Sequence, residues 1–120
     1  MSRRETGVLG ETLALGYLAD RGYELVERNY RTRHGEIDLI LRTEDVLVFV
    51  EVKARRGRGY GDPLEAVTPA KQERVRLMAE AYLAEQGPEF LERFEEMRFD
   101  AVGIVIRGDK REIRHVEDAF

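Results

Sequence analysis

The sequence predicts one small α/β domain, and three observations support that prediction. The chain has 120 residues, a length that favours a single domain over residues 1–120, and 42% of them are hydrophobic, which is enough for one modest core. Apolar residues recur at helical spacing in two segments and alternate with other residues in several more. Because helix and strand patterns are mixed along the chain, the class is α/β or α+β.

The N-terminal half begins with a helical pattern. A helix is expected at residues 7–21, with Gly22 as its stop. Its apolar face consists of Gly10, Leu13, Ala14, Tyr17 and Leu18. A strand is expected at residues 23–29. Two further strands are expected at residues 35–43 and 46–53, where apolar residues alternate on either side of a short polar turn. This pattern is typical of an antiparallel hairpin.

A second helix is expected after a loop at residues 55–63, which is rich in Gly and Arg. Thr68 is a good N-cap and Pro69 suits the first helical position, so the helix begins there and ends near Gly87. The inner face of this helix consists of Val75, Met78, Ala79 and Tyr82. In its first turn, Gln72 is a polar residue that points either to a nearby site or to solvent.

The C-terminal part predicts one or two strands. Residues 88–97 form a short acidic helix or a loop, and residues 99–106 form a strand. Asp100 begins that strand and is expected to pair with a neighbouring Arg. After a turn, residues 112–116 form an edge strand, on which His115 is expected at the surface.

Composition and charge limit the function. The chain contains no Cys, which excludes disulfides, Cys-zinc sites and thiol catalysis. The formal net charge is −4, so any contact with nucleic acid must come from a local basic patch. No apolar run approaches the roughly 20 residues that a membrane span needs, and the N-terminal segment has no apolar signal core. The expected location is cytoplasmic, without a membrane partner.

The register of the predicted hairpin brings two carboxylates together. With Glu44 and Asp45 in the turn, one face is apolar and buried. That face pairs Leu41 with Val48, Leu39 with Val50 and Ile37 with Val52. The other face pairs Ile40 with Phe49, Asp38 with Glu51 and Glu36 with Lys53. Like charges at opposite positions repel, and the pair Asp38–Glu51 therefore needs a compensating partner.

A divalent cation would compensate the charge of this pair. Carboxylate oxygens are the ligands that Mg²⁺ or Mn²⁺ prefers. Lys53 lies two residues after Glu51, where its ammonium group would hold or activate a water molecule, and the backbone carbonyl of Val52 is a further candidate ligand. The alternative is an ordinary solvated sheet face with a weak ion pair. Ile40 and Phe49 share this face, which indicates that it is partly covered.

A basic patch flanks the hairpin despite the negative net charge. It consists of Arg31 and Arg33 before the hairpin and of Arg55, Arg56, Arg58 and Tyr60 after it. Arginine matches phosphate oxygens by bidentate contact, and an exposed tyrosine can stack on an unpaired base. Both segments are expected near the same end of the hairpin. The alternative is that they form only a solvated loop.

These motifs together resemble a known group of proteins. The run Gly35–Ile40 followed by Glu51-Val52-Lys53 is similar to the Asp…Glu-x-Lys signature of the PD-(D/E)xK nuclease superfamily, which includes restriction enzymes and archaeal Holliday-junction resolvases. More narrowly, the chain resembles the YraN family of bacterial endonuclease-like proteins over about residues 10–106. The segments that carry this resemblance also include Gly10-Glu11, Gly22-Tyr23, Arg28-Asn29-Tyr30-Arg31 and Phe99-Asp100.

The resemblance implies a restriction-endonuclease-like core, with the order helix, three strands, helix and strand around a central mixed sheet. It implies that Asp38 and Glu51 are metal ligands and that Lys53 is the catalytic lysine. Glu11 on the first helix becomes a candidate additional ligand, although a plain surface role fits its place beside the apolar face as well. Related resolvases are dimers, so a homodimer is an expectation too, but the sequence shows no dimer seam.

Three functional hypotheses follow. The first is metal-dependent hydrolysis of phosphodiester bonds in DNA, including branched or repair and recombination intermediates, with Mg²⁺ or Mn²⁺ as cofactor. The second is a nucleic-acid-binding module that keeps the fold without catalysis. The third is an interaction protein that uses its acidic second half as a docking surface. The fold alone does not choose among them, because one fold supports many functions.

Overall fold

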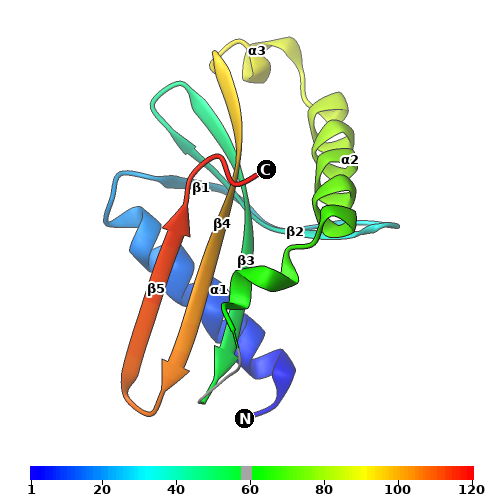
Figure 1. The fold of residues 1–120 in the computed structure, drawn as a ribbon. Helices are drawn as coiled ribbons and strands as arrows, with labels where there is room; N and C mark the ends of the chain where they lie inside the picture. The colour runs from blue at the N-terminus through cyan, green and yellow to red at the C-terminus, as the bar shows by residue number, and fades with distance from the viewer. Residues whose placement is uncertain (58–60) are drawn as a thin grey trace.

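The computed structural model describes residues 1–57 and 61–120 and contains a five-stranded mixed sheet with helices on both faces (Figure 1). The strands stand in chain order, β1-β2-β3-β4-β5, and only β3 and β4 are parallel. The elements are α1 (Arg3–Ala19), β1 (Glu24–Thr32), β2 (Gly35–Thr43), β3 (Val46–Arg56), the 3₁₀ helix η1 (Pro63–Ala66), α2 (Pro69–Glu85), α3 (Pro88–Leu91), β4 (Glu96–Arg107) and β5 (Lys110–Val116). The expected α/β class and element order are confirmed.

Two hydrophobic clusters hold the helices against the sheet. Ala14 and Leu18 of α1 pack on one face of the sheet, in a cluster whose strand members include Leu39. The residues of α2 pack on the other face, in a cluster that includes Ile40 and Phe49. The central strands are therefore buried on both sides, which is why β2 and β3 carry nearly continuous apolar runs.

The first helix begins earlier than its apolar spacing predicts. Ser2 accepts a hydrogen bond from the backbone N–H of Glu5, and the Glu5 side chain accepts one from the backbone N–H of Ser2. This capping box satisfies N–H groups that would otherwise lack partners, so the helix starts at Arg3 instead of residue 7. A Cβ atom built at Gly10 would lie 2.5 Å from the Cβ of Ala54. The glycine therefore allows α1 to pack closely on β3.

The hairpin register is confirmed for the five pairs nearest the turn, from Thr43–Val46 to Leu39–Val50. The three expected pairs beyond them are wrong, because the β2–β3 ladder ends at Leu39–Val50. Asp38 therefore does not pair with Glu51 in the ladder, nor Glu36 with Lys53. Ile37 packs in the α2 cluster and not beside Leu39. The regular alternation of side chains between the two faces of β2 is therefore broken between Ile37 and Leu39. The part of β2 before Leu39 lies away from β3, toward α2 (Figure 1).

The second half follows the sequence closely. Thr68 caps α2 through the N–H of Lys71, and the four expected inner residues of this helix are its buried ones. The loop was expected to begin at residue 55, but β3 continues to Arg56 and remains paired with β4 up to that residue. The short helix α3 and the edge strand β5 are both present. No helix in the described parts of the chain is long and apolar enough to span a membrane.

Candidate active site

The separation of β2 from β3 creates a cleft with a volume of about 610 Å³. The start of α1, the start of β2, the second half of β3 and Lys71 of α2 line it. Its carboxylates are Glu11, Glu36, Asp38 and Glu51, and its cations are Arg3, Lys53, Arg55, Arg56 and Lys71. The structure thus brings the four residues proposed from the sequence for metal chemistry, Glu11, Asp38, Glu51 and Lys53, into one cleft together with Val52.

Asp38 and Glu51 line the same cleft beyond the end of the ladder. Asp38 is 8% exposed, and its Oδ2 accepts a hydrogen bond of 2.8 Å from the backbone N–H of Val52. Burial raises the pKa of Asp38, and the neighbouring charge of Glu51 raises it further. Burial also raises the pKa of Glu51, although the ammonium groups of two lysines oppose that effect. The two carboxyls therefore resist ionising together unless a cation joins them.

Among the residues that the structure describes, one oxygen of Glu51 has no partner. The side chain is 2% exposed, and its Oε1 lies 3.3 Å from Lys71 Nζ and 3.9 Å from Lys53 Nζ. Among the described residues, its Oε2 has no hydrogen-bond partner, although buried carboxylate oxygens normally have one. An oxygen of this kind, beside a second buried carboxylate, is what a cation ligand needs. The residues present therefore fit Mg²⁺ or Mn²⁺.

Two carboxylates complete the acidic side of the cleft. Glu11, Glu36 and Asp38 each offer one oxygen, and these oxygens lie within 4.8 Å of one another. Glu11 comes from α1 and lines the cleft, and its role as a ligand stays a prediction. Glu36 was expected to pair with Lys53, but it contacts Asn29 and Arg31 instead. The cause is the break in β2, which carries Glu36 away from β3.

Lys71 is a member of the site that was not expected from the sequence. Gln72, for which a place near a site or in solvent was expected, donates to the carbonyl of Val67 and is not among the residues that line the cleft. Lys71 lies three residues after the N-cap Thr68, and the start of α2 is directed toward Glu51 by the packing of Val75 and Met78 against the sheet. A lone lysine in the first turn of a helix carries no signal in the sequence, since helical periodicity marks only the apolar face.

The proposed basic patch is divided. Arg55 and Arg56 line the cleft, and Arg56 Nε donates to Thr6 Oγ1 at 3.3 Å. Arg31 and Arg33 do not line it, because both lie near the turn between β1 and β2, where Arg31 pairs with Glu36. Both segments lie at the end of the hairpin away from its turn, and whether they act as one patch stays a prediction. Arg58 and Tyr60 lie outside the described residues.

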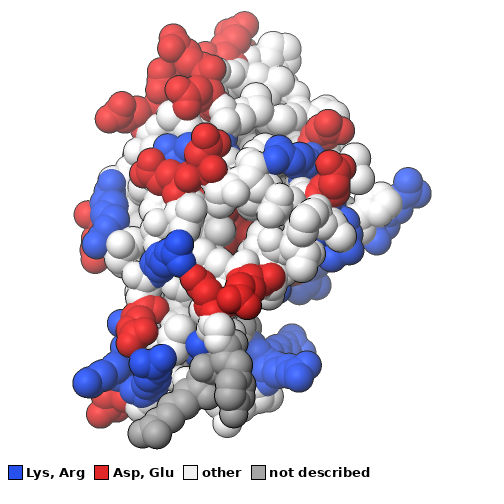
Figure 2. All heavy atoms as spheres, in the orientation of Figure 1, with Lys and Arg blue, Asp and Glu red and all other residues white. Residues whose placement is uncertain are grey.

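Charge is unevenly distributed over the surface. In Figure 2, Asp and Glu side chains gather at the upper end of the molecule, where Figure 1 places α3, and Lys and Arg side chains are prominent at the lower end. Exposed residues of the acidic end include Glu89, Glu92, Glu95 and Glu96. The cleft contains residues from the first turns of α1 and the last residues of β3, so it lies toward the end richer in cations.

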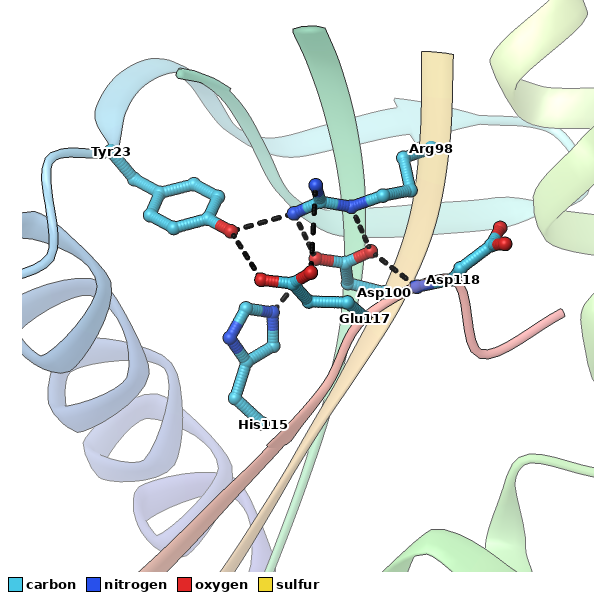
Figure 3. Close-up of polar contacts among 6 residues, drawn as sticks. All are labelled: Tyr23, Arg98, Asp100, His115, Glu117 and Asp118. Carbon is cyan, nitrogen blue, oxygen red and sulfur yellow. Dashed lines mark hydrogen bonds and ion pairs between the residues drawn. The ribbon is translucent and has the colours of Figure 1, made fainter. Parts of the chain in front are cut away.

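A second polar cluster surrounds Asp100, which is fully buried on β4 (Figure 3). Arg98 donates two hydrogen bonds of 2.8 Å to the two oxygens of Asp100. His115 Nε2 lies 2.7 Å from Asp100 Oδ2, and the backbone N–H of Asp118 donates to Oδ1. Burial acts to raise the pKa of Asp100, but these hydrogen bonds outweigh it and lower that pKa.

The Asp100 cluster is saturated, since each oxygen of that carboxylate has two partners. The expected pairing of Asp100 with a neighbouring Arg is confirmed, whereas the surface role expected for His115 is wrong: its side chain is 9% exposed. Tyr23 accepts a further hydrogen bond from Arg98. The cluster ties β4, β5 and the turn after α1 together and stays separate from the cleft, whose lining contains none of its residues.

The fold and the cleft define a class of small mixed α/β protein, in which buried carboxylates and lysines meet where two central strands separate. Comparison with known sequences makes the assignment more specific: the chain belongs to the family described as Uncharacterised protein family UPF0102, whose sequence model matches residues 10–104. This match confirms the resemblance to the YraN family, the narrower of the two resemblances found in the sequence.

Similar proteins cover nearly the whole chain. A UPF0102 protein of Rhodococcus jostii is 51% identical over 95% of this chain and 94% of its own length. One from Syntrophomonas wolfei is 45% identical over 98% of both, and one from Dictyoglomus turgidum is 39% identical over 100% of both. Among solved structures, Pyrococcus furiosus SfsA in complex with Ca²⁺ aligns with a TM-score of 0.36 and 17% identity over 95% of this chain and 63% of that chain. That likeness is too low to bear on the function.

Proposed function

We propose that this protein is a metal-dependent phosphodiester hydrolase that acts on nucleic acid, with DNA as the leading substrate. The observation that carries the proposal is the unpartnered Oε2 of buried Glu51, which lies in one cleft with Asp38, Glu11 and Lys53. The resemblance of Asp38 and Glu51-Val52-Lys53 to the PD-(D/E)xK signature supports the same chemistry, and so does the cation-rich lining of the cleft.

The chain's own residues have distinct roles in this proposal. Asp38 and Glu51 hold Mg²⁺ or Mn²⁺, with Glu11 and the carbonyl of Val52 as further ligands. When bound, such a cation lowers the pKa of a coordinated water molecule and stabilises charge that develops on the phosphate oxygens. Lys53, 36% exposed and 3.9 Å from Glu51, orients the attacking water and stabilises the transition state.

Arg55 and Arg56 are suited to hold the phosphate backbone. Both line the cleft beside Lys53, and guanidinium groups bind phosphate oxygens without reading the base sequence. Because the formal net charge of the chain is −4, binding depends on these few cations and is expected to be weak and sensitive to salt. A homodimer would supply a second set of contacts, and sedimentation with and without DNA measures whether it forms.

The test is a cleavage assay on a panel of labelled substrates: linear duplex, single strand, flap, four-way junction and RNA, each with Mg²⁺, Mn²⁺ or EDTA. We expect metal-dependent products from the wild type. Asp38→Asn and Lys53→Met are expected to lower the rate at least about 100-fold, the usual cost of losing a group that stabilises the transition state. Asp45→Asn, at an exposed position in the β2–β3 turn, is the matched control and should cleave as the wild type does.

Three outcomes would reject the proposal. Cleavage that persists at full rate in Asp38→Asn would place the chemistry elsewhere. Salt-sensitive binding of nucleic acid by the wild type without products on any substrate would favour the non-catalytic binding module. If the wild type neither binds nucleic acid nor takes up Mn²⁺ in a calorimetric titration, the interaction protein becomes the better description.

A further inference from the structure

Asn29 has an unusual backbone for a residue in the middle of a strand. Its φ angle is 55°, in the left-handed region that Asn tolerates better than most residues. In a regular strand, Arg28 and Tyr30 would lie on the same face. Here Arg28 contacts Glu11 and Thr12 of α1, whereas Tyr30 packs in the cluster formed with α2. At Asn29 the strand therefore changes which of its side chains face α1 and which face α2.

The neighbouring strand turns over at the matching place. Tyr30 is paired with Ile37, and both pack in the α2 cluster, whereas Arg28 is paired with Leu39, which packs in the α1 cluster. The change of face in β2 thus falls between Ile37 and Leu39, at Asp38. Pairing of β2 with β3 also stops at Leu39. The left-handed residue in β1 consequently lies beside the point where β2 separates from β3 and the cleft opens.

The side chain of Asn29 reaches into the same cluster of acids. Its Nδ2 donates to Glu11 Oε1 at 2.9 Å and to Glu36 Oε1 at 3.1 Å. A carboxamide nitrogen has two N–H groups, and each is used on a different carboxylate. Those two carboxylates and Asp38 offer oxygens within 4.8 Å of one another. Carboxylates at that separation repel, so a shared donor that holds two of them is an arrangement for fixing their positions.

We propose that Asn29 is the positioning residue of the metal site. Its left-handed backbone turns the β1–β2 pair over where the cleft opens, and its carboxamide holds Glu11 and Glu36 toward Asp38. This inference rests on the proposed function, because it requires that the cleft binds a cation. Groups that hold metal ligands by hydrogen bonds typically change metal affinity by about 10-fold to 100-fold when they are removed.

The first test uses Asn29→Gly, which keeps the freedom to adopt a positive φ angle and removes only the carboxamide. The control is Glu44→Gly, at another non-glycine residue with a positive φ angle, 52°, in the exposed β2–β3 turn. Mn²⁺ affinity is measured by calorimetry, the environment of bound Mn²⁺ by electron paramagnetic resonance, and folding by the thermal midpoint. We expect Asn29→Gly to melt close to the wild type, to bind Mn²⁺ about 10-fold more weakly, and to change the spectrum of the bound ion. Glu44→Gly should match the wild type in all three.

The second test uses only the wild-type protein, so it does not depend on whether a variant folds. In wild-type protein labelled with ¹⁵N, the two side-chain N–H protons of Asn29 report directly on Glu11 and Glu36. Titration with Mg²⁺ should shift both resonances, because the carboxylates of Glu11 and Glu36 have oxygens within 4.8 Å of Asp38, a proposed ligand of the cation. Resonances that do not move while Mg²⁺ binds would overturn the proposal, whatever the behaviour of Asn29→Gly.

Failure of this inference is distinct from failure of the proposed function. If the wild type binds Mn²⁺ and Asn29→Gly binds it within a factor of two, the metal site stands and the role of Asn29 is wrong. If the wild type binds neither Mn²⁺ nor Mg²⁺, the proposed function fails and the positioning role fails with it. If Glu44→Gly weakens Mn²⁺ binding as much as Asn29→Gly does, the loss is a general effect of introducing glycine. That result would also reject the inference.

Discussion

Replacing Asp38 by Asn is expected to stabilise the metal-free protein at alkaline pH while it destroys the metal site. Asp38 is 8% exposed, and burial together with the charge of Glu51 raises its pKa to about 8. In the unfolded chain the pKa of an aspartate is near 4, so the folded chain holds more protons between these values. Stability therefore falls as the pH rises through this window, because the unfolded state releases the proton more easily.

The magnitude follows from the same pKa. A carboxyl that ionises near pH 4 in the unfolded chain and near pH 8 in the folded chain costs on the order of 5 kcal/mol of stability at pH 8. Asparagine has no charge to bury, and its side-chain oxygen can still accept the hydrogen bond from Val52. At pH 4, where the carboxyl is largely protonated in the folded protein, the gain should nearly vanish.

The assay is urea denaturation of the wild type and Asp38→Asn in EDTA at pH 4 and pH 8, repeated at pH 8 with Mn²⁺. The variant should be more stable by several kcal/mol in EDTA at pH 8, and Mn²⁺ should raise the stability of the wild type alone. A cation at 100 times its Kd adds about 2.7 kcal/mol. Asp45→Asn, at an exposed position, should show no such dependence. Equal stability of the wild type and Asp38→Asn in EDTA at pH 8 would refute the reasoning.

Three further predictions concern groups that support the cleft and the sheet. Lys71→Met should lower stability in EDTA at pH 8 by about 1–3 kcal/mol and by less at pH 5, because Glu51 loses its nearest cation and carries more of its negative charge at the higher pH. Asp100→Ala should cost about 3–5 kcal/mol at pH 7, since it removes the buried carboxylate that pairs most closely with Arg98. Because the pKa of Asp100 is lowered, this contribution fades as the pH falls. Gly10→Ala should cost about 1–3 kcal/mol through contact with Ala54. Gly16→Ala should stabilise α1 by up to about 1 kcal/mol, because among the described residues a Cβ atom there would meet nothing within 4 Å beyond the backbone of its own helix. Denaturant unfolding measures all of them.

Each of these predictions has an outcome that contradicts it. A loss in Lys71→Met that is as large at pH 5 as at pH 8 would mean that the lysine does not act through the charge of Glu51. A stability profile of Asp100→Ala parallel to the wild type at acidic pH would deny the role of that carboxylate in acid unfolding. Equal effects of alanine at Gly10 and Gly16 would show that the close approach of α1 to β3 is not limiting.

The sequence alone predicted most of the fold because local patterns specify local structure. Period-two alternation identified the hairpin and set its register for five pairs. The cap at Thr68 and the inner face of α2 were also readable, since capping and helical spacing act within one element. The start of α1 was missed because apolar spacing marks only the buried face, and the capping box at Ser2 lies before it.

The residues of the candidate site could be predicted from the sequence, but their arrangement in space could not. Motif order pointed to Asp38, Glu51, Lys53 and Glu11, and the structure places all four in one cleft. The expected pairing of Asp38 with Glu51 was wrong because regular alternation was extended through a point where the strands turn over. Nothing in the sequence announces a left-handed backbone at Asn29, since the surrounding packing selects it.

By itself, then, the sequence determined the element order, the hairpin register near its turn and the identity of the acidic and basic groups that could do chemistry. Only the tertiary structure decided which of those groups meet. Lys71 reaches Glu51 because α2 packs on one face of the sheet, and Glu11 approaches Asp38 because α1 packs on the other. These contacts join residues far apart in the chain, and their geometry depends on how distant elements bury their apolar surfaces together, which no local pattern encodes.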